Sequence, residues 1–137
     1  MQVQPYLFFD GRCQEAIDFY RQAVGAEVQM VMHYKDSPVQ TSQPPGSDDK
    51  IMHASMRIGE TEVLLSDGMC QGKPSFQGFS LAVSPADDAA AQTTFAALAD
   101  GGTVTMPLGK TFFASSFGML TDRFGVGWML MVPARQG

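Results

Sequence analysis

The 137-residue sequence lacks several features that would assign it to a broad class at once. It has no apolar run near the roughly 20 residues that a transmembrane helix needs, so we expect no membrane span and no membrane partner. Its amino end carries no basic residue before the short apolar patch. That end therefore does not resemble a secretory signal, and we expect a cytoplasmic protein.

Cysteine and positive charge are also scarce. The only two cysteines, Cys13 and Cys70, lie far apart without a CxxC motif, which favours two inert thiols over a disulfide. Nine Lys and Arg residues against 14 Asp and Glu residues give a net charge of -5 and a pI near 4.7. The basic residues are scattered, so the sequence offers no basic face for nucleic acid, and we expect no such partner.

The sequence does contain an internal repeat. Residues 18–30, DFYRQAVGAEVQM, align without a gap with residues 94–106, TFAALADGGTVTM, so that Gly25 meets Gly101. In each copy apolar residues at helical spacing come before the glycine, which is suited to ending a helix in the left-handed conformation. Residues of alternating polarity follow the glycine. Each copy therefore predicts a helix and then a strand.

Further strands flank both copies. A short apolar strand precedes each helix and two more strands follow, namely PYLFF, IMHASMRI and TEVLLS in the first half and GFSLAV, FASSFGML and VGWMLMV in the second. The chain is thus predicted to be one α+β domain over 1–137 made of two βαβββ modules, about 1–70 and 75–137. An insertion at 34–50, rich in Pro, Ser, Gly and Asp, predicts a solvated loop. It could be a lid, an interface element or a disordered segment.

This order resembles the vicinal oxygen chelate superfamily, which includes glyoxalases, extradiol dioxygenases and fosfomycin-resistance proteins. More narrowly, four segments resemble its PhnB-like branch, often labelled as related to 3-demethylubiquinone methyltransferase: FDGRCQEAIDFY, VLLSDGM, GKPSFQGFSLAV and TFFASSFGMLTDRFGVGWML. The resemblance implies that the modules pair into a curved, cup-shaped mixed sheet with helices on its convex side. It also implies a small molecule in the cup and a homodimer, to which loop 34–50 could contribute.

The resemblance further implies a divalent metal held by His and Glu from the first and last strands of each module. The expected positions do not carry these ligands. Residues 4–9, 78–83 and 126–132 contain no His, Asp or Glu, and residues 61–66 contain only Glu62, near the start of the strand. We therefore expect no metal of the usual kind and no other cofactor.

A polar row on residues 51–58, IMHASMRI, is a candidate ligand site. His53, Ser55 and Arg57 alternate with apolar residues, so they share one face of the strand, which we predict to line the cup. Together they could bind a small anionic or carbonyl-bearing molecule. Alternatively the face is solvated, and Arg57 pairs with a surface carboxylate such as Glu62. His53 is also a candidate general base, although no partner carboxylate is evident.

Four further positions have both a functional and a structural interpretation. Phe79 and Trp128 could stack on a planar ligand, or they could belong to the core. Asp67 could serve a ligand site, but its place before a glycine is typical of a turn. Asp122, with the arginine after it, is expected to build the turn between the last two strands.

The sequence therefore predicts a small-molecule-binding protein without the usual metal site and with an unspecified ligand. One alternative is a glyoxalase- or dioxygenase-type enzyme with a metal-free site, or with a rearranged one around His53, Asp67 and Glu62. Another is an assembly protein whose cup is filled by side chains. A doubly wound methyltransferase would need a glycine-rich loop after its first strand, and residues 9–13, FDGRC, do not form one.

Overall fold

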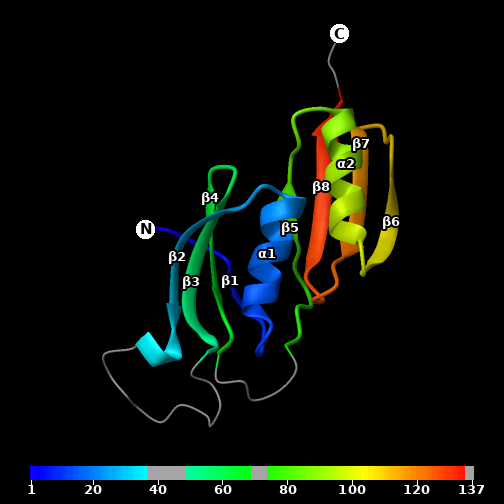
Figure 1. Ribbon diagram of the computed structural model, residues 1–137. Helices are drawn as coiled ribbons and strands as arrows, with labels where there is room; N and C mark the ends of the chain where they lie inside the picture. Colours follow the sequence, from blue (N-terminus) through cyan, green and yellow to red (C-terminus); the bar gives the residue numbers. More distant parts are fainter. Residues whose placement is uncertain (37–48, 69–73, 135–137) are drawn as a thin grey trace. The chain divides into compact units, whose positions relative to one another are not determined.

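The computed structural model describes residues 1–36, 49–68 and 74–134. The chain divides into two compact units, Met1–Pro74 and Ser75–Gly137. Each unit has the β-α-β-β-β order that the repeat predicts (Figure 1). The two units are called unit 1 and unit 2 below, and each is described by itself.

Unit 1 is a four-stranded mixed sheet with one helix. Its elements are β1 (Tyr6–Phe8), α1 (Cys13–Ala23), β2 (Glu27–His33), the short 3-10 helix η1 (Tyr34–Asp36), β3 (Ile51–Ile58) and β4 (Thr61–Ser66). The strand order is β1-β4-β3-β2, with β1 parallel to β4 and the other pairs antiparallel. Most of the predicted loop at 34–50, and Cys70, lie outside the described residues.

The core of unit 1 lies between α1 and one face of the sheet. Ala16, Ile17 and Tyr20 recur on one side of the helix and are at most 2% exposed. Alternate residues of the strands point toward the helix and are at most 3% exposed, namely Leu7, Ala54, Met56, Val63 and Leu65. The strand residues that alternate with these form what we call the helix-free face of unit 1. The helix ends before Gly25, which has a φ of 67°, as the sequence predicts.

A buried aspartate joins three segments of unit 1. Asp67 is 3% exposed, and its Oδ1 accepts hydrogen bonds from the backbone N–H of Gly11 at 2.7 Å and of Cys13 at 2.8 Å. Its Oδ2 accepts one from the N–H of Ile51 at 2.8 Å. The loop before α1, the start of α1 and the start of β3 are thus held together. Burial, and to a lesser extent the nearby Asp67 carboxylate, raise the pKa of the Cys13 thiol, so the thiol stays protonated.

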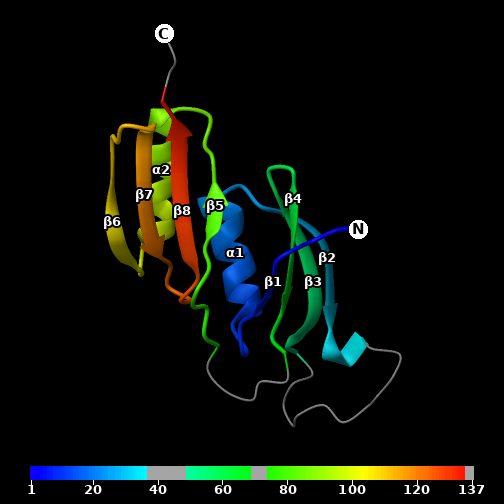
Figure 2. The ribbon, with the colours of Figure 1, turned by 180° about the vertical axis from the view of Figure 1, so that it is seen from behind.

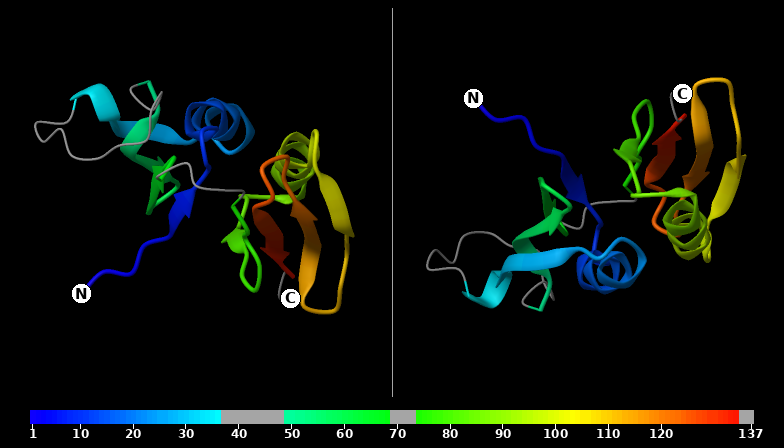
Figure 3. Two further views of the ribbon diagram at one scale, coloured as in Figure 1. Left: turned by 90° about the horizontal axis from the view of Figure 1, so that it is seen from below. Right: turned by 90° about the horizontal axis from the view of Figure 1, so that it is seen from above.

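Unit 2 repeats the architecture. Its elements are β5 (Leu81–Val83), α2 (Asp88–Ala99), β6 (Thr103–Gly109), β7 (Ala114–Thr121) and β8 (Gly127–Pro133). The strand order is β5-β8-β7-β6, again with one parallel pair, β5 and β8. Seen from both sides, α2 covers a single face of this sheet (Figures 1 and 2). Figure 3 views both helices end-on, each beside the sheet of its own unit.

Trp128 and Asp122 anchor the β7–β8 connection in unit 2. Trp128 is 1% exposed, and its indole N–H donates to Asp122 Oδ2 at 2.8 Å. Asp122 Oδ1 accepts from the N–H groups of Phe124 at 2.8 Å and Val126 at 3.1 Å. These bonds confirm the predicted turn role of Asp122.

The described residues form two α-helices, α1 with 11 residues and α2 with 12. Neither is long and apolar enough to cross a membrane.

Candidate functional site

The helix-free face of unit 1 combines aromatic, apolar and polar side chains. Strand register places Leu64 opposite both Tyr6 and Ser55, and Met32 opposite His53. The face therefore consists of Tyr6, Phe8, Glu27, Met30, Met32, His53, Ser55, Arg57, Glu62, Leu64 and Ser66. The three predicted ligand-binding residues of β3 lie on it: Ser55 has the apolar neighbours Met30 and Leu64, whereas Arg57 lies between two glutamates. Such a surface can bind an organic molecule through apolar contact and a few directed hydrogen bonds.

The phenol of Tyr6 meets the imidazole of His53 on this face. Tyr6 Oη lies 2.8 Å from His53 Nδ1, and the Tyr6 ring stacks on Phe8 with centroids 4.8 Å apart. Burial is the main cause that raises the pKa of the Tyr6 phenol above 10.0, so the hydroxyl keeps its proton at neutral pH. If the phenol donates its hydrogen to Nδ1, the imidazole keeps its Nε2–H as a free donor for a ligand. If instead Nδ1–H donates to the phenol oxygen, the phenol O–H is the donor that remains for a ligand. In either tautomer the pair offers one hydrogen-bond donor to a ligand.

Arg57 lies at the end of the same row and has a carboxylate partner. Its Nη2 donates to Glu27 Oε2 at 2.5 Å, across the directly paired positions of β2 and β3. The alternative of a surface ion pair is thus realised, with Glu27 in place of the expected Glu62. Both side chains are largely solvent-exposed, so the pair contributes little to stability. Ser55, between Arg57 and His53 on the strand, is 7% exposed.

The other predicted site residues lie elsewhere. Phe79 precedes β5 in unit 2 and is 48% exposed, so its ring is accessible to a ligand. Trp128 is part of the unit 2 core and is hydrogen-bonded to Asp122. The carboxylate of Asp67 is occupied by three backbone N–H groups of unit 1. A ligand-binding role for Phe79 and Trp128 stays a prediction.

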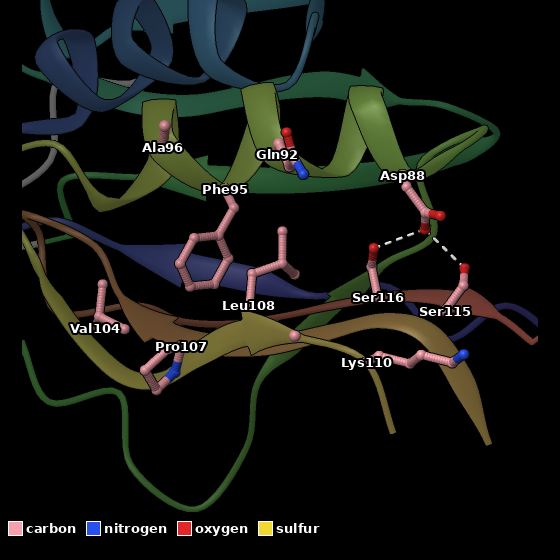
Figure 4. Close-up of a pocket in the computed structure, with 11 residues that line it drawn as sticks. Asp88, Gln92, Phe95, Ala96, Val104, Pro107, Leu108, Lys110, Ser115 and Ser116 are labelled. Carbon is pink, nitrogen blue, oxygen red and sulfur yellow. Dashed lines mark hydrogen bonds between the residues drawn. The ribbon is translucent and has the colours of Figure 1, made fainter. Parts of the chain in front are cut away.

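A cavity of about 540 Å³ lies within unit 2, between α2 and strands β6 and β7 (Figure 4). Its lining consists of Asp88, Gln92, Phe95, Ala96, Val104, Pro107, Leu108, Gly109, Lys110, Ser115 and Ser116. None of the residues that the sequence singled out is in this lining. The cavity lies on the helix side of its sheet, and all of its lining residues belong to unit 2.

The strands of the two units carry few groups that could hold a metal. On the helix-free side, β1 contributes Tyr6 and Phe8, and β4 contributes Leu64 and Ser66 next to Glu62. No group of three or more His, Cys, Asp or Glu side chains in the described ranges is placed to hold a metal ion. The donor set therefore does not fit the His and Glu site that the resemblance implies.

Sequence reasoning missed Tyr6 and the cavity. Residues 4–9 contain no His or carboxylate, and the phenol of Tyr6 is not one of the metal ligands that the resemblance implies. Tyr6 and His53 are 47 residues apart and meet only because β4 pairs with both β1 and β3. Two features of the sequence point to the cavity: adjacent acidic residues at the start of α2 and adjacent serines on β7. Only the packing of α2 on β7 brings Asp88 to these serines.

Comparison with known proteins supports the same fold. The family model described as 3-demethylubiquinone-9 3-methyltransferase matches residues 1–131. Protein YjdN of Escherichia coli is 35% identical over 144 residues, which cover 99% of this chain and 98% of the relative. The crystal structure of protein PA1353 from Pseudomonas aeruginosa superposes with a TM-score of 0.85 at 41% identity, covering 97% of this chain and 98% of that one.

A PhnB protein from Bacillus cereus gives a TM-score of 0.81 at 27% identity, with coverage of 96% and 99%. More distant structures share the fold, including a glyoxylase/bleomycin resistance protein/dioxygenase domain from Frankia at a TM-score of 0.63 and 15% identity, with coverage of 98% of each chain. The two βαβββ modules are thus those of the glyoxalase-like fold. The chain belongs to the family described as 3-demethylubiquinone-9 3-methyltransferase, the PhnB-like branch of the proteins with this fold.

Proposed function

We propose that the protein binds a small organic molecule on the helix-free face of unit 1. The observation that carries the proposal is the hydrogen-bonded pair of Tyr6 and His53, which lies beside Phe8, Met32 and Leu64 on this face. A carbonyl or anionic oxygen would accept the donor that this pair keeps available, and the ligand body would lie against Phe8 and Leu64. Glyoxalase-fold proteins are a small-molecule-binding group, which supports the proposal.

Arg57 and Ser55 would extend this site toward an anionic ligand. A guanidinium can contact two oxygens of a carboxylate or phosphonate at once, and the hydroxyl adds a donor. Glu27 holds Arg57 in the unliganded arrangement. Because that ion pair is exposed and weak, a ligand anion could compete for the guanidinium at small cost. In unit 2, Phe79 and Trp128 remain proposed aromatic contacts of a ligand, separately from this face, and Trp128, at 1% exposure, would have to move to reach one.

The binding site is proposed to work without the divalent metal of the superfamily. Support comes from the helix-free side of β1 and β4, where phenyl, phenol, hydroxyl and alkyl groups fill every position except that of Glu62. Such groups are poor ligands for divalent cations. Elemental analysis of protein purified without an affinity tag should find far less than one divalent metal per chain. One tightly held metal per chain would contradict the proposal.

The second candidate function is an enzyme that moves a proton on a carbonyl compound. The Tyr6–His53 pair favours it, because one member can hydrogen-bond the carbonyl oxygen while the imidazole accepts a proton from the adjacent carbon. NMR would detect solvent deuterium entering that carbon of a bound probe. If no exchange above the rate in buffer is observed, the enzyme is ruled out and the binding function is retained. The methyltransferase in the family description is not proposed, since neither mixed sheet has the doubly wound order of such enzymes.

A thermal-shift screen of metabolite acids, quinones and phosphonates tests the binding site. A ligand at about 100 times its Kd should add roughly 2.7 kcal/mol to the free energy of unfolding. Tyr6→Phe should weaken binding by about fivefold, the value of one hydrogen bond near 1 kcal/mol. His53→Ala and Arg57→Ala should weaken it as well, the latter only for anions.

Two matched variants control this screen. His33→Ala removes the other histidine of the chain, which lies 3.6 Å from Asp36, and Arg21→Ala removes an exposed arginine from the last turn of α1. Both should bind ligands as the wild type does. Ligands that bind all of these variants equally would place the site away from β1 and β3 and would overturn the proposal.

We also propose that the protein forms a homodimer, which light scattering at micromolar protein would test.

A further inference from the structure

An irregular edge strand borders the cavity of unit 2. From Met106 to Gly109 β6 advances three residues while its partner β7 advances only two, from Met119 to Phe117. The extra residue is a β-bulge that contains Pro107 and Leu108. Proline lacks an N–H for the ladder and is tolerated here because β6 is the edge strand of its sheet. Bulges occur often beside binding sites, where they redirect side chains.

Two lining residues of the cavity, Phe95 and Leu108, pack closely on a glycine of the neighbouring strand β7. A Cβ atom at Gly118 would lie 2.7 Å from the Phe95 ring and 3.0 Å from the Cα of Leu108. The first distance is shorter than real Cβ contacts and the second is tight, so a larger residue here would displace Phe95 or Leu108. Phe95 from α2 and Leu108 from the bulge therefore lie side by side over β7 (Figure 4). They form an apolar end of the cavity together with Ala96, Val104 and Pro107.

The opposite end is polar and carries both signs of charge. Asp88 Oδ1 accepts hydrogen bonds from the hydroxyls of Ser115 and Ser116, each at 2.7 Å. A carboxylate can accept about four hydrogen bonds, so a ligand donor would join the partners that Asp88 already has. The ammonium of Lys110 lies at the same end, and the amide of Gln92 lies one turn along α2 from Asp88 (Figure 4).

We propose that this cavity binds a zwitterionic small molecule with an apolar body, the class to which apolar amino acids belong. The ligand ammonium donates to Asp88, its carboxylate accepts from Lys110 and Gln92, and its body packs against Phe95 and Leu108. The volume is within the range of roughly 300–1,000 Å³ that small-molecule sites occupy. The site belongs to unit 2 alone and does not depend on the function proposed for unit 1.

Three related probes separate the two charges. L-phenylalanine carries both charges, phenethylamine only the ammonium, and 3-phenylpropionate only the carboxylate, on nearly the same body. Titrations followed by two-dimensional NMR should show saturable binding of phenylalanine, with shifts at the amides of α2 and β6. Each singly charged probe should bind about fivefold more weakly, since an exposed ion pair is worth at most about 1 kcal/mol. Equal binding of all three would overturn the zwitterion assignment, and no saturable binding would overturn the site.

Matched variants locate the ammonium contact. Asp88→Asn should weaken phenylalanine binding by about fivefold and leave 3-phenylpropionate unchanged. Asp87→Asn is the control, because it makes the same charge change one residue away. Asp87 caps α2 by accepting a hydrogen bond from Ala90 N–H at 2.8 Å, and asparagine is an equally good cap. If both variants lose binding equally, the effect is the general charge at the start of α2, and the proposed contact is wrong.

Two more variants test the rest of the site. Lys110→Gln should weaken phenylalanine and leave phenethylamine unchanged. Ala96→Phe fills the apolar end and should abolish binding of all three probes, whereas Thr93→Phe adds the same ring at an exposed position of α2 outside the cavity lining. Unchanged binding in Ala96→Phe would overturn the proposal. Helical circular dichroism of each variant checks that it is folded.

Discussion

The two units share their element order but hold it together differently. Each has a buried aspartate that accepts three hydrogen bonds. In unit 1 Asp67 binds segments up to 56 residues away in the chain. In unit 2 the three hydrogen bonds described for Asp122 come from groups within six residues. The same chemical device thus closes a tertiary contact in one copy and a local turn in the other, so a sequence repeat does not imply repeated stabilising contacts.

The repeat also differs at one aligned position after each helix. Gly25 aligns with Gly101, so Ala26 aligns with Gly102. Ala26 is buried, at 6% exposure. At Gly102 a Cβ atom would lie 2.2 Å from the carbonyl oxygen of Thr121. A methyl group that unit 1 buries would therefore collide with backbone in unit 2.

The largest expected effect tests the aspartate comparison. Asp67→Ala leaves three buried N–H groups without an acceptor and should lower the free energy of unfolding by about 3–4 kcal/mol. Urea unfolding followed by circular dichroism would measure the change. Hydrogen exchange should show lost protection at α1 and β3 but little change in β7 and β8. Asp18→Ala, on the exposed side of α1, is the control and should stay within about 0.5 kcal/mol.

Asp122→Ala sharpens the same comparison. Its loss of protection should be centred on the β7–β8 connection, because the three hydrogen bonds described for its side chain are local. Loss of protection throughout unit 2 would mean that Asp122 is as long-range in effect as Asp67, and the contrast between the two carboxylates would fail.

A smaller effect is expected at Gly102, the glycine that aligns with Ala26 of unit 1. Gly102→Ala should destabilise the protein by about 2–3 kcal/mol, since the neighbouring Thr121 oxygen belongs to backbone and cannot move aside. Gly25→Ala in unit 1 meets no atom within 4 Å and carries only the cost of its positive φ, about 1 kcal/mol. Equal midpoints for the two variants in urea would remove the proposed difference between the units.

The smallest effect is the response to alkaline pH. Both cysteines and all three tyrosines are in unit 1, and unit 2 has none. The raised pKa of Cys13 means that above about pH 9 the unfolded thiol ionises while the folded thiol does not. Unit 1 should therefore lose up to about 1.4 kcal/mol per pH unit, and Tyr6 adds to this loss above pH 10.

Hydrogen exchange of each unit at pH 8 and at higher pH would measure this loss. Cys13→Ala should flatten the dependence in unit 1. A parallel loss in unit 2, which has no ionisable thiol or phenol, would contradict the assignment.

The fold could be predicted because its signals are local. Apolar spacing and a glycine at each helix end predicted α1 and α2, and strand alternation predicted β3 and β4 at their observed bounds. The first strand of unit 2 was predicted too long, over 78–83, whereas β5 begins at Leu81. Gly78 adopts a φ of 83°, which interrupts an extended strand.

The candidate sites could be predicted only in part. The face shared by His53, Ser55 and Arg57 follows from alternation along one strand. Their partners Tyr6 and Glu27 come from other strands, and strand order and register are long-range properties that no local pattern encodes. The bulge at Pro107 and Leu108 likewise depends on how two strands pair.

The placement of Trp128 has an optical consequence. It is the only tryptophan of the chain and is buried in unit 2, while Tyr6, Tyr20 and Tyr34 all belong to unit 1. Selective excitation of the indole therefore reports on unit 2 alone, and near-ultraviolet dichroism of the phenols reports on unit 1. Without any added label, the natural chromophores divide the protein into two separately observable halves, and the order in which the two copies of the repeat unfold can be read from a single urea titration.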